Sequence, residues 1–267
     1  MKNEIRALSA REYIARLAAS GRYNFASKVA QAALGVSAAA TKLALSRLAK
    51  QGEIASPVRG FYIIVPPEYR SLGSLPADQF IPGLMKSQRQ VYYAGLLTAA
   101  QYHGAAHHRP QEFQVMLAKN RRPIQCGAVR VAFMARKRIA EVPIQEFNTP
   151  RGTIRVSTTE ATAVDLVGYQ HHVGDLDQVA MILSELAEKI DPQKLVLAAE
   201  TAPVPWAQRL GYLLEHVGAG EKVASLKAYV RQHAKQSVAL LSTAPVKDTE
   251  RDESWKLFVN AAVIVEL

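Results

Sequence analysis

The sequence predicts an α+β protein in two parts, residues 1–70 and residues 71–267. Three observations predict this class. Apolar residues recur at helical spacing through the first part and are punctuated by glycines. Short β-branched and aromatic runs between residues 112 and 156 predict a small sheet. Capped helical patterns then fill residues 158–235, so the larger part is a mixed α/β domain with a helical C-terminal half.

The first part is expected to form helices at residues 9–20, 25–34 and 38–51. Ser9 and Ser37 are candidate N-caps, and Gly35 can take the left-handed conformation of a tight turn between helices. An extended stretch begins at Ile54, a turn follows over residues 57–60, and a strand covers residues 61–65. The order of helix, helix, turn, helix and hairpin is that of a winged helix-turn-helix.

In this arrangement the third helix has a buried inner face and an outer face that enters the major groove of DNA. The residues expected inside are Leu34, Val36, Thr41, Leu45 and Leu48. Leu43 is expected to be exposed, where it either touches a thymine methyl or packs on the wing. The residues expected to contact DNA are Ser37, Lys42, Ser46, Arg47, Lys50, Arg59 and Tyr62. The alternative is a small helical domain used for protein contact.

The second part opens with a Pro- and Gly-rich connector over residues 66–89, with a domain boundary near residue 72. A helix is expected over residues 91–103, and strands at 112–117, 124–133 (broken at Gly127), 142–148 and 153–156. A Ser157–Glu160 capping box opens a helix over residues 158–168. Further helices are expected near 175–189, 191–200, 204–217 and 221–235, and a late strand at 255–267 returns to the sheet.

The net charge of +10 is unevenly spread. Residues 1–70 carry 11 Lys and Arg against 4 Asp and Glu, residues 71–155 carry 12 against 4, and residues 156–267 carry 10 against 15. A basic body of this size favours a polyanionic partner such as nucleic acid. Two basic stretches of the second part are either solvated loops or additional contacts to DNA or to an acidic partner: Lys119, Arg121, Arg122, Arg136, Lys137 and Arg138.

Several classes of protein are disfavoured. The single cysteine, Cys126, rules out an internal disulfide scaffold and a cysteine-cluster zinc site. No phosphate-binding loop, dinucleotide fingerprint, nucleophile elbow or His-Glu-x-x-His motif occurs. We find no membrane-length apolar run and no signal peptide, so a cytoplasmic protein without membrane association is expected.

Two groups of residues carry the enzyme alternative. His103, His107 and His108 could share a metal, but the glycine and proline around them favour structural or phosphate-facing histidines. Glu160 and Asp165 could form the acidic pair of a metal-dependent nuclease or nucleic-acid-modifying enzyme. A structural role is expected for both carboxylates, and neither a cofactor nor a metal ion is expected.

The chain resembles the AbiEi family of antitoxins and transcriptional regulators over nearly its whole length. The resemblance rests chiefly on motifs of the second part, at residues 92–94, 99–107, 148–150, 156–163, 165–167 and 208–212. It is supported in the first part by residues 45–48, 52–54 and 59–62.

The resemblance implies a toxin–antitoxin or phage-defence module. It implies a winged helix that binds inverted repeats in its own promoter, with possible self-association on double-stranded DNA. It also implies a C-terminal domain that neutralises a nucleotidyltransferase-like toxin, with or without a direct complex. The leading hypothesis is therefore an antitoxin and DNA-binding autorepressor that is not an enzyme.

Overall fold

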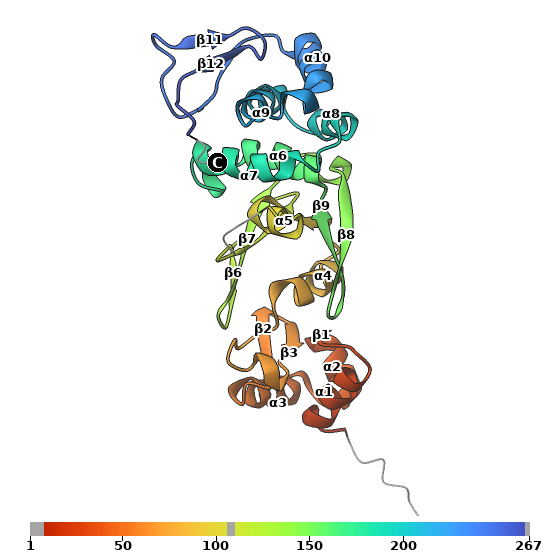
Figure 1. The fold of residues 1–267 in the computed structure, drawn as a ribbon. Helices are drawn as coiled ribbons and strands as arrows, with labels where there is room; N and C mark the ends of the chain where they lie inside the picture. The colour runs from red at the N-terminus through yellow and green to blue at the C-terminus, as the bar shows by residue number, and fades with distance from the viewer. Residues whose placement is uncertain (1–7, 106–109, 265–267) are drawn as a thin grey trace, which may run out of the picture.

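The computed structural model describes residues 8–105 and 110–264. The described chain is a mixed α+β structure with ten α-helices and three sheets. Figure 1 shows an elongated molecule with the N-terminal helices at one end, a sheet in the middle and the C-terminal helices at the other end. Within the described residues no single helix is long and apolar enough to cross a membrane; only the bent pair α2 and α3 together reaches that length and composition.

The N-terminal unit contains three helices and a three-stranded sheet in the order β1-β3-β2. Its elements are α1 (Ala10–Ala19), β1 (Asn24–Ala26), α2 (Ser27–Leu34), α3 (Ala38–Lys50), β2 (Ile54–Val58) and β3 (Phe61–Ile64). Ser9 and Glu12 form a reciprocal capping box at the start of α1. Gly35 has a φ of 65° at the end of α2, and the Ser37 hydroxyl accepts a hydrogen bond from the Ala40 amide at 3.2 Å. These caps and the left-handed glycine are as predicted.

Two predictions for this unit are wrong. The expected helix at residues 25–34 starts only at Ser27, because Phe25 lies in β1 and pairs in register with Tyr62 of β3. In the strand, Phe25 is 3% exposed and meets the Tyr13 ring edge-on at 5.4 Å. Val36, expected inside, is 39% exposed, whereas the other four predicted inner residues are buried.

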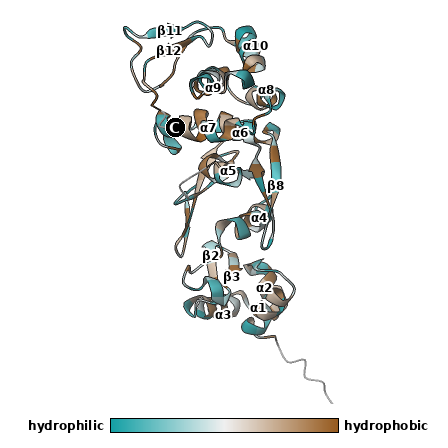
Figure 2. Ribbon diagram, viewed as in Figure 1, coloured by the Kyte–Doolittle hydropathy of each residue, from teal (hydrophilic) through white to brown (hydrophobic). Residues whose placement is uncertain are grey.

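The central strand β3 serves two hydrophobic cores. Phe61 and Ile63 belong to the core under the six-stranded sheet, and Ile64 belongs to the core of the three N-terminal helices, on which Tyr62 also packs. Because successive side chains of a strand point to opposite faces, one short strand joins the two cores. Figure 2 shows the hydrophobic character of β3 within the otherwise mixed N-terminal unit.

The expected connector contains a helix, α4 (Ala77–Ser87), although Pro82 and Gly83 lie inside it. The helix forms because it buries an apolar face that includes Phe80, Ile81, Leu84 and Met85. Proline and glycine in this segment therefore do not mark a loop.

The six-stranded sheet has the order β6-β7-β5-β4-β9-β8. Its strands are β4 (Tyr92–Ala94), β5 (Phe113–Leu117), β6 (Ile124–Cys126), β7 (Val129–Ala135), β8 (Ile144–Thr149) and β9 (Gly152–Ser157). β5 and β7 are parallel, as are β4 and β9, and the other pairs are antiparallel. The expected helix at 91–103 is instead β4 followed by α5 (Leu96–Tyr102), so sequence periodicity missed a central strand.

The C-terminal half contains five helices, of which the first packs against the sheet and the others pack on it and on one another, and it ends in a small sheet of its own. The helices are α6 (Thr159–Gly168), α7 (Leu176–Ala187), α8 (Pro192–Glu200), α9 (Val204–His216) and α10 (Ala224–His233). The last strands are β10 (Val238–Ala239), β11 (Glu250–Asp252) and β12 (Leu257–Val259), in the order β10-β12-β11. The late strand therefore does not return to the main sheet, which corrects our expectation.

The predicted Ser157–Glu160 capping box is also wrong. Thr158 is the N-cap of α6, and its hydroxyl accepts from the Ala161 amide at 3.3 Å. Ser157 ends β9, and its hydroxyl lies 2.7 Å from that of Thr162. The Glu160 carboxylate instead accepts from the Asp191 amide at 3.1 Å, so it links α6 to the start of α8.

Candidate nucleic-acid interface

Helix α3 is held so that one face is presented to solvent. The three residues from Gly35 to Ser37 join α2 to α3, and the two helices are bent by 109° relative to each other. Thr41, Leu45 and Leu48 form the buried inner face of α3, and the Thr41 hydroxyl donates to the Ser37 carbonyl at 3.0 Å. This packing fixes which side of the helix remains free.

The outer face of α3 carries most of the predicted contact residues. Ser37, Lys42, Ser46, Arg47 and Lys50 are all exposed. Within the described residues, the three cations of this set form no ion pair. Cations without carboxylate partners can neutralise phosphates without first breaking a bond within the protein.

The turn of the β2–β3 hairpin presents the next predicted residue. Arg59 is exposed at this turn, and Gly60 takes a φ of 83° that accommodates the reversal of the chain. The Ser56 hydroxyl lies 3.0 Å from the carbonyl oxygens of Val58 and Phe61, so it braces the turn. Tyr62 is half-buried, and its ring stacks on Phe25 at 5.6 Å between centroids.

The two basic stretches of the second part, residues 119–122 and 136–138, do not lie on α3 or on the β2–β3 hairpin. The β6–β7 hairpin lies beside β2 of the N-terminal unit, and β7 runs from there to Ala135, whose neighbour Arg136 meets Thr201 at the end of α8. Residues 136–138 follow that far end, and residues 119–122 follow β5, whose Leu117 pairs with Ala135. Both stretches therefore begin side by side, at the end of β7 that lies away from β2.

The members of these stretches differ in availability. Lys119, Arg122 and Lys137 are exposed. Arg121 donates to the Gln88 side chain at 2.7 Å, and burial lowers its pKa. Arg138 pairs with Glu141 and donates to the Glu200 carbonyl at 2.7 Å.

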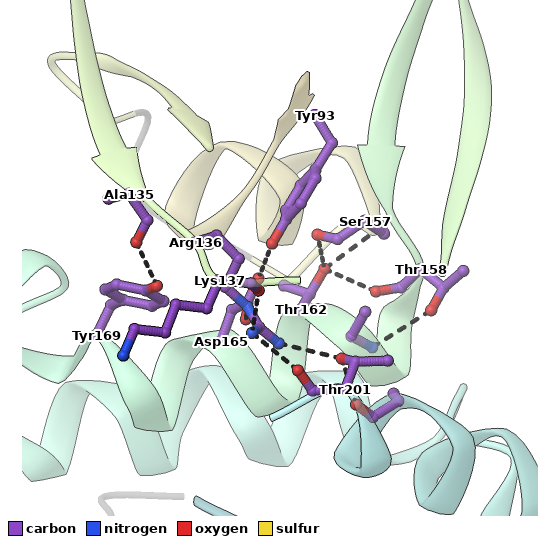
Figure 3. A network of polar contacts seen from close by, with 12 residues as sticks. Tyr93, Ala135, Arg136, Lys137, Ser157, Thr158, Thr162, Asp165, Tyr169 and Thr201 are labelled. Atoms are coloured by element: carbon purple, nitrogen blue, oxygen red, sulfur yellow. Dashed lines mark hydrogen bonds and ion pairs between the residues drawn. The ribbon is translucent and has the colours of Figure 1, made fainter. Parts of the chain in front are cut away.

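Arg136 corrects the prediction of a surface contact, because its side chain is 2% exposed. Figure 3 shows it in a polar network between the sheet and the C-terminal helices. Its Nε donates to Asp165 Oδ1 at 2.9 Å, and its terminal nitrogens donate to the Thr201 carbonyl and hydroxyl at 3.0 and 3.1 Å. Such a guanidinium cannot reach a partner molecule.

Asp165, on which the enzyme alternative depends, is the acceptor at the centre of this network. It is 0% exposed and also accepts from the Tyr93 hydroxyl at 2.5 Å. Burial and the neighbouring carboxylate raise the pKa of Tyr93 well above its ordinary value, so the phenol keeps the proton that it donates. With Glu160 bound to the start of α8, both carboxylates serve contacts within the fold.

His103 is likewise part of the interior. Its Nε2 lies 2.8 Å from the Ser157 carbonyl, and burial lowers the pKa of the ring. His107 and His108 lie outside the described residues. Among residues 8–105 and 110–264, no group of three or more metal-ligating side chains comes together.

One contact between distant parts of the chain is not indicated by the sequence. Arg151, in the β8–β9 turn, lies with its guanidinium 3.5 Å from the centre of the Tyr23 ring in the N-terminal unit. Its Nε donates to Gln79 of α4 at 2.8 Å, and its Nη2 lies 3.4 Å from Glu68. The Asn148–Gly152 segment predicts a hairpin turn, but nothing in the sequence indicates which distant ring that turn meets.

A comparison with protein families matches a segment within the second part of the chain. Residues 93–216 match the model of the AbiEi antitoxin C-terminal domain, which confirms the AbiEi resemblance over that segment. This match supports an antitoxin role, implies a toxin partner in general and suggests a non-enzymatic regulator. No curated protein matches the chain.

The fold is shared with a solved structure. The crystal structure of the RV2827C protein from Mycobacterium tuberculosis superposes with a TM-score of 0.65 at 16% sequence identity. The alignment covers 93% of this chain and 90% of that one, so the likeness extends through both parts of the molecule.

Proposed function

We propose that the protein is an antitoxin that also binds DNA and represses its own operon. Residues 1–70 form a winged helix-turn-helix that binds inverted repeats in the promoter as double-stranded DNA. Residues 71–267 carry the antitoxin function against a nucleotidyltransferase-like toxin. The observation that supports DNA binding is the outer face of α3, where three cations stand exposed and without ion pairs among the described residues.

The arrangement of α2 and α3 supports this proposal. Helix-turn-helix motifs join two helices at roughly 90–120° through a short turn that often contains glycine. The angle of 109° and the turn at Gly35 agree with that pattern. A helix of about 10–12 Å diameter enters a major groove of about 12 Å width, and the hairpin turn at Arg59 then lies beside the DNA backbone.

The direct test is promoter binding by full-length protein. We expect Lys42→Ala with Arg59→Ala to weaken binding about tenfold or more at 0.15 M salt, because two phosphate contacts are lost. The slope of log affinity against log salt should fall by about two units. Fluorescence anisotropy over a salt series measures both quantities.

A matched control removes two cations at the other end of the molecule. Arg231 and Lys235 lie in or just after α10, are exposed, and are far from α3 in Figure 1. Their double alanine variant should bind as wild type does. Equal binding by both double variants would show that the α3 face is not the DNA site.

Antitoxin activity should be separable from repression. Co-expression with the toxin gene of the same operon should show that Lys42→Ala with Arg59→Ala still protects cells while a promoter reporter is derepressed. Full-length variants are needed because removing the N-terminal unit would expose the core that Phe61 and Ile63 complete.

The basic residues of the second part are better suited to the partner than to promoter DNA. Lys119, Arg122 and Lys137 are exposed in the two stretches that begin at the end of β7 away from β2, with Arg121 and Arg138 beside them in the chain. We expect alanine at the three exposed positions to weaken protection from the toxin and to leave promoter affinity unchanged. The reverse result would assign these residues to DNA.

A further inference from the structure

Leu43 lies at the centre of the outer face of α3 and is 56% exposed. An α-helix advances about 100° per residue, which places Leu43 opposite the buried residues Thr41, Leu45 and Leu48. Ala39 precedes it by one turn, and Ser46 and Arg47 follow it by one turn, so these residues flank it on the same face.

The Leu43 side chain takes no part in the hydrophobic core of the N-terminal unit. It is also not among the partly buried side chains that pack against that core. The exposed residues before it, Ala38, Ala39 and Ala40, are all small. The start of α3 can therefore approach a partner surface closely, with the longer apolar side chain of Leu43 projecting beside Lys42, Ser46 and Arg47.

We propose that Leu43 contacts the C5-methyl group of a thymine in the operator and so determines part of its sequence. This inference rests on the proposed DNA-binding function. In the major groove the thymine methyl is the apolar group among hydrogen-bond donors and acceptors. A leucine that loses its water there is best matched by this methyl, whereas Lys42, Arg47 and Lys50 meet phosphates that carry no sequence information.

The experiment uses full-length protein and a promoter duplex whose binding site has been mapped by footprinting. Each thymine of the site is replaced in turn by deoxyuridine, which pairs identically but lacks the methyl group. We expect one thymine position in each half-site at which this change weakens wild-type binding about fourfold, the value of one buried methyl.

The decisive comparison is between Leu43→Ala and wild type on both duplexes. Leu43→Ala should bind the thymine duplex more weakly than wild type does. Replacing that thymine by deoxyuridine should not weaken binding by Leu43→Ala any further. Leu197→Ala provides the matched control, because Leu197 is a 58% exposed leucine on α8. This control should respond to deoxyuridine as wild type does.

Two results would overturn the inference in distinguishable ways. If wild type prefers the promoter over a scrambled duplex, and deoxyuridine weakens wild type and Leu43→Ala equally at every position, the assignment of Leu43 is wrong and DNA binding stands. If wild type shows no preference for the promoter, the proposed DNA-binding function fails together with the inference.

Discussion

Arg136 and Asp165 form a buried ion pair, with side-chain exposures of 2% and 0%. Removing one partner alone would leave the other charge buried without a counter-charge. We expect Arg136→Met to lower the free energy of unfolding by about 3–5 kcal/mol, because it leaves the Asp165 carboxylate buried without its cation. Arg136→Met combined with Asp165→Leu should be less destabilised than the single variant, because an apolar pair needs no hydration. Chemical denaturation measures both.

The control is Arg138→Met, which breaks an exposed pair with Glu141. Exposed pairs are screened by solvent, so little change is expected. If Arg136→Met and Arg138→Met lowered the free energy of unfolding by similar amounts, loss of the buried network would not explain the effect of Arg136→Met.

His103 should make stability depend on pH. Because burial lowers the pKa of the folded ring below the ordinary 6.5, the unfolded chain binds more protons as pH falls through that value. The free energy of unfolding should therefore decrease from pH 7 toward pH 5. His103→Gln can still donate to the Ser157 carbonyl and should flatten this slope.

The slope that remains in His103→Gln includes a contribution from His172, whose pKa burial also lowers. Urea titrations at several pH values give the two slopes, and NMR of the ring protons gives the midpoint for His103. An unchanged slope in His103→Gln would contradict this account.

At the residue scale, sequence predicts exposure well where periodicity is strong. The outer positions of α3 follow from helical spacing, and all of them are exposed. The burial of Arg136 could not be predicted from the sequence, because Arg136, Lys137 and Arg138 form one basic run and the other two are exposed. Only the tertiary position of Asp165, on α6, shows which arginine points inward.

At the element scale, the fold explains one of the motifs that indicated the AbiEi resemblance, residues 208–212 on α9. Gln208 donates from its amide to the carbonyls of Trp255 and Lys256 at 3.1 and 2.8 Å. Arg209 donates to the Ala239 carbonyl at 2.9 Å. A Cβ at Gly211 would lie 2.0 Å from the Trp255 ring, so the motif docks the last sheet onto α9.

Gly211→Ala should therefore lower the free energy of unfolding by about 1–3 kcal/mol, as overpacking does in a dense core. Gly220→Ala is the control, because its nearest neighbour, Glu215 Cγ, lies 3.9 Å away. Thermal unfolding followed by tryptophan fluorescence compares them. Equal midpoints would show that Trp255 can move aside without cost.

Apart from α4, the elements that sequence missed are short. β1 and β4 have three residues each and lie just before a helix, so their apolar side chains continue the helical pattern. What defines them as strands is pairing with distant residues, Tyr62 for β1 and Val115 for β4. The long helices other than α4, and the β6–β7 and β8–β9 hairpins, carried local signals and were predicted nearly to their ends.

At the scale of the whole molecule, Arg151 links the β8–β9 turn to the N-terminal unit through Tyr23 and to α4 through Gln79. We expect Arg151→Ala to speed hydrogen exchange in residues 20–26 and 66–79 while exchange in α6 to α9 stays unchanged. Arg151→Lys should give nearly the same result, because an ammonium lacks the planar fork that stacks and donates at once.

Arg155→Ala is the control on the same hairpin. Arg155 is 48% exposed, and its pair with Glu146 spans 3.8 Å. Exchange in the N-terminal segments should match wild type in this variant. Faster exchange there in both alanine variants would mean that the hairpin as a whole, and not the Arg151 contact, holds the two parts together.

The two faces of β3 have a consequence for how the molecule comes apart. Phe61 and Ile63 belong to one core and Ile64 belongs to the other. Unfolding of either part would therefore expose apolar side chains of the other part's core to solvent. Unfolding is then a shared, cooperative event and not the sum of two independent ones. We therefore expect a single peak in calorimetric unfolding. An isolated N-terminal unit would expose Phe61 and Ile63 to solvent, so it is not expected to fold as an independent domain when fused to another protein.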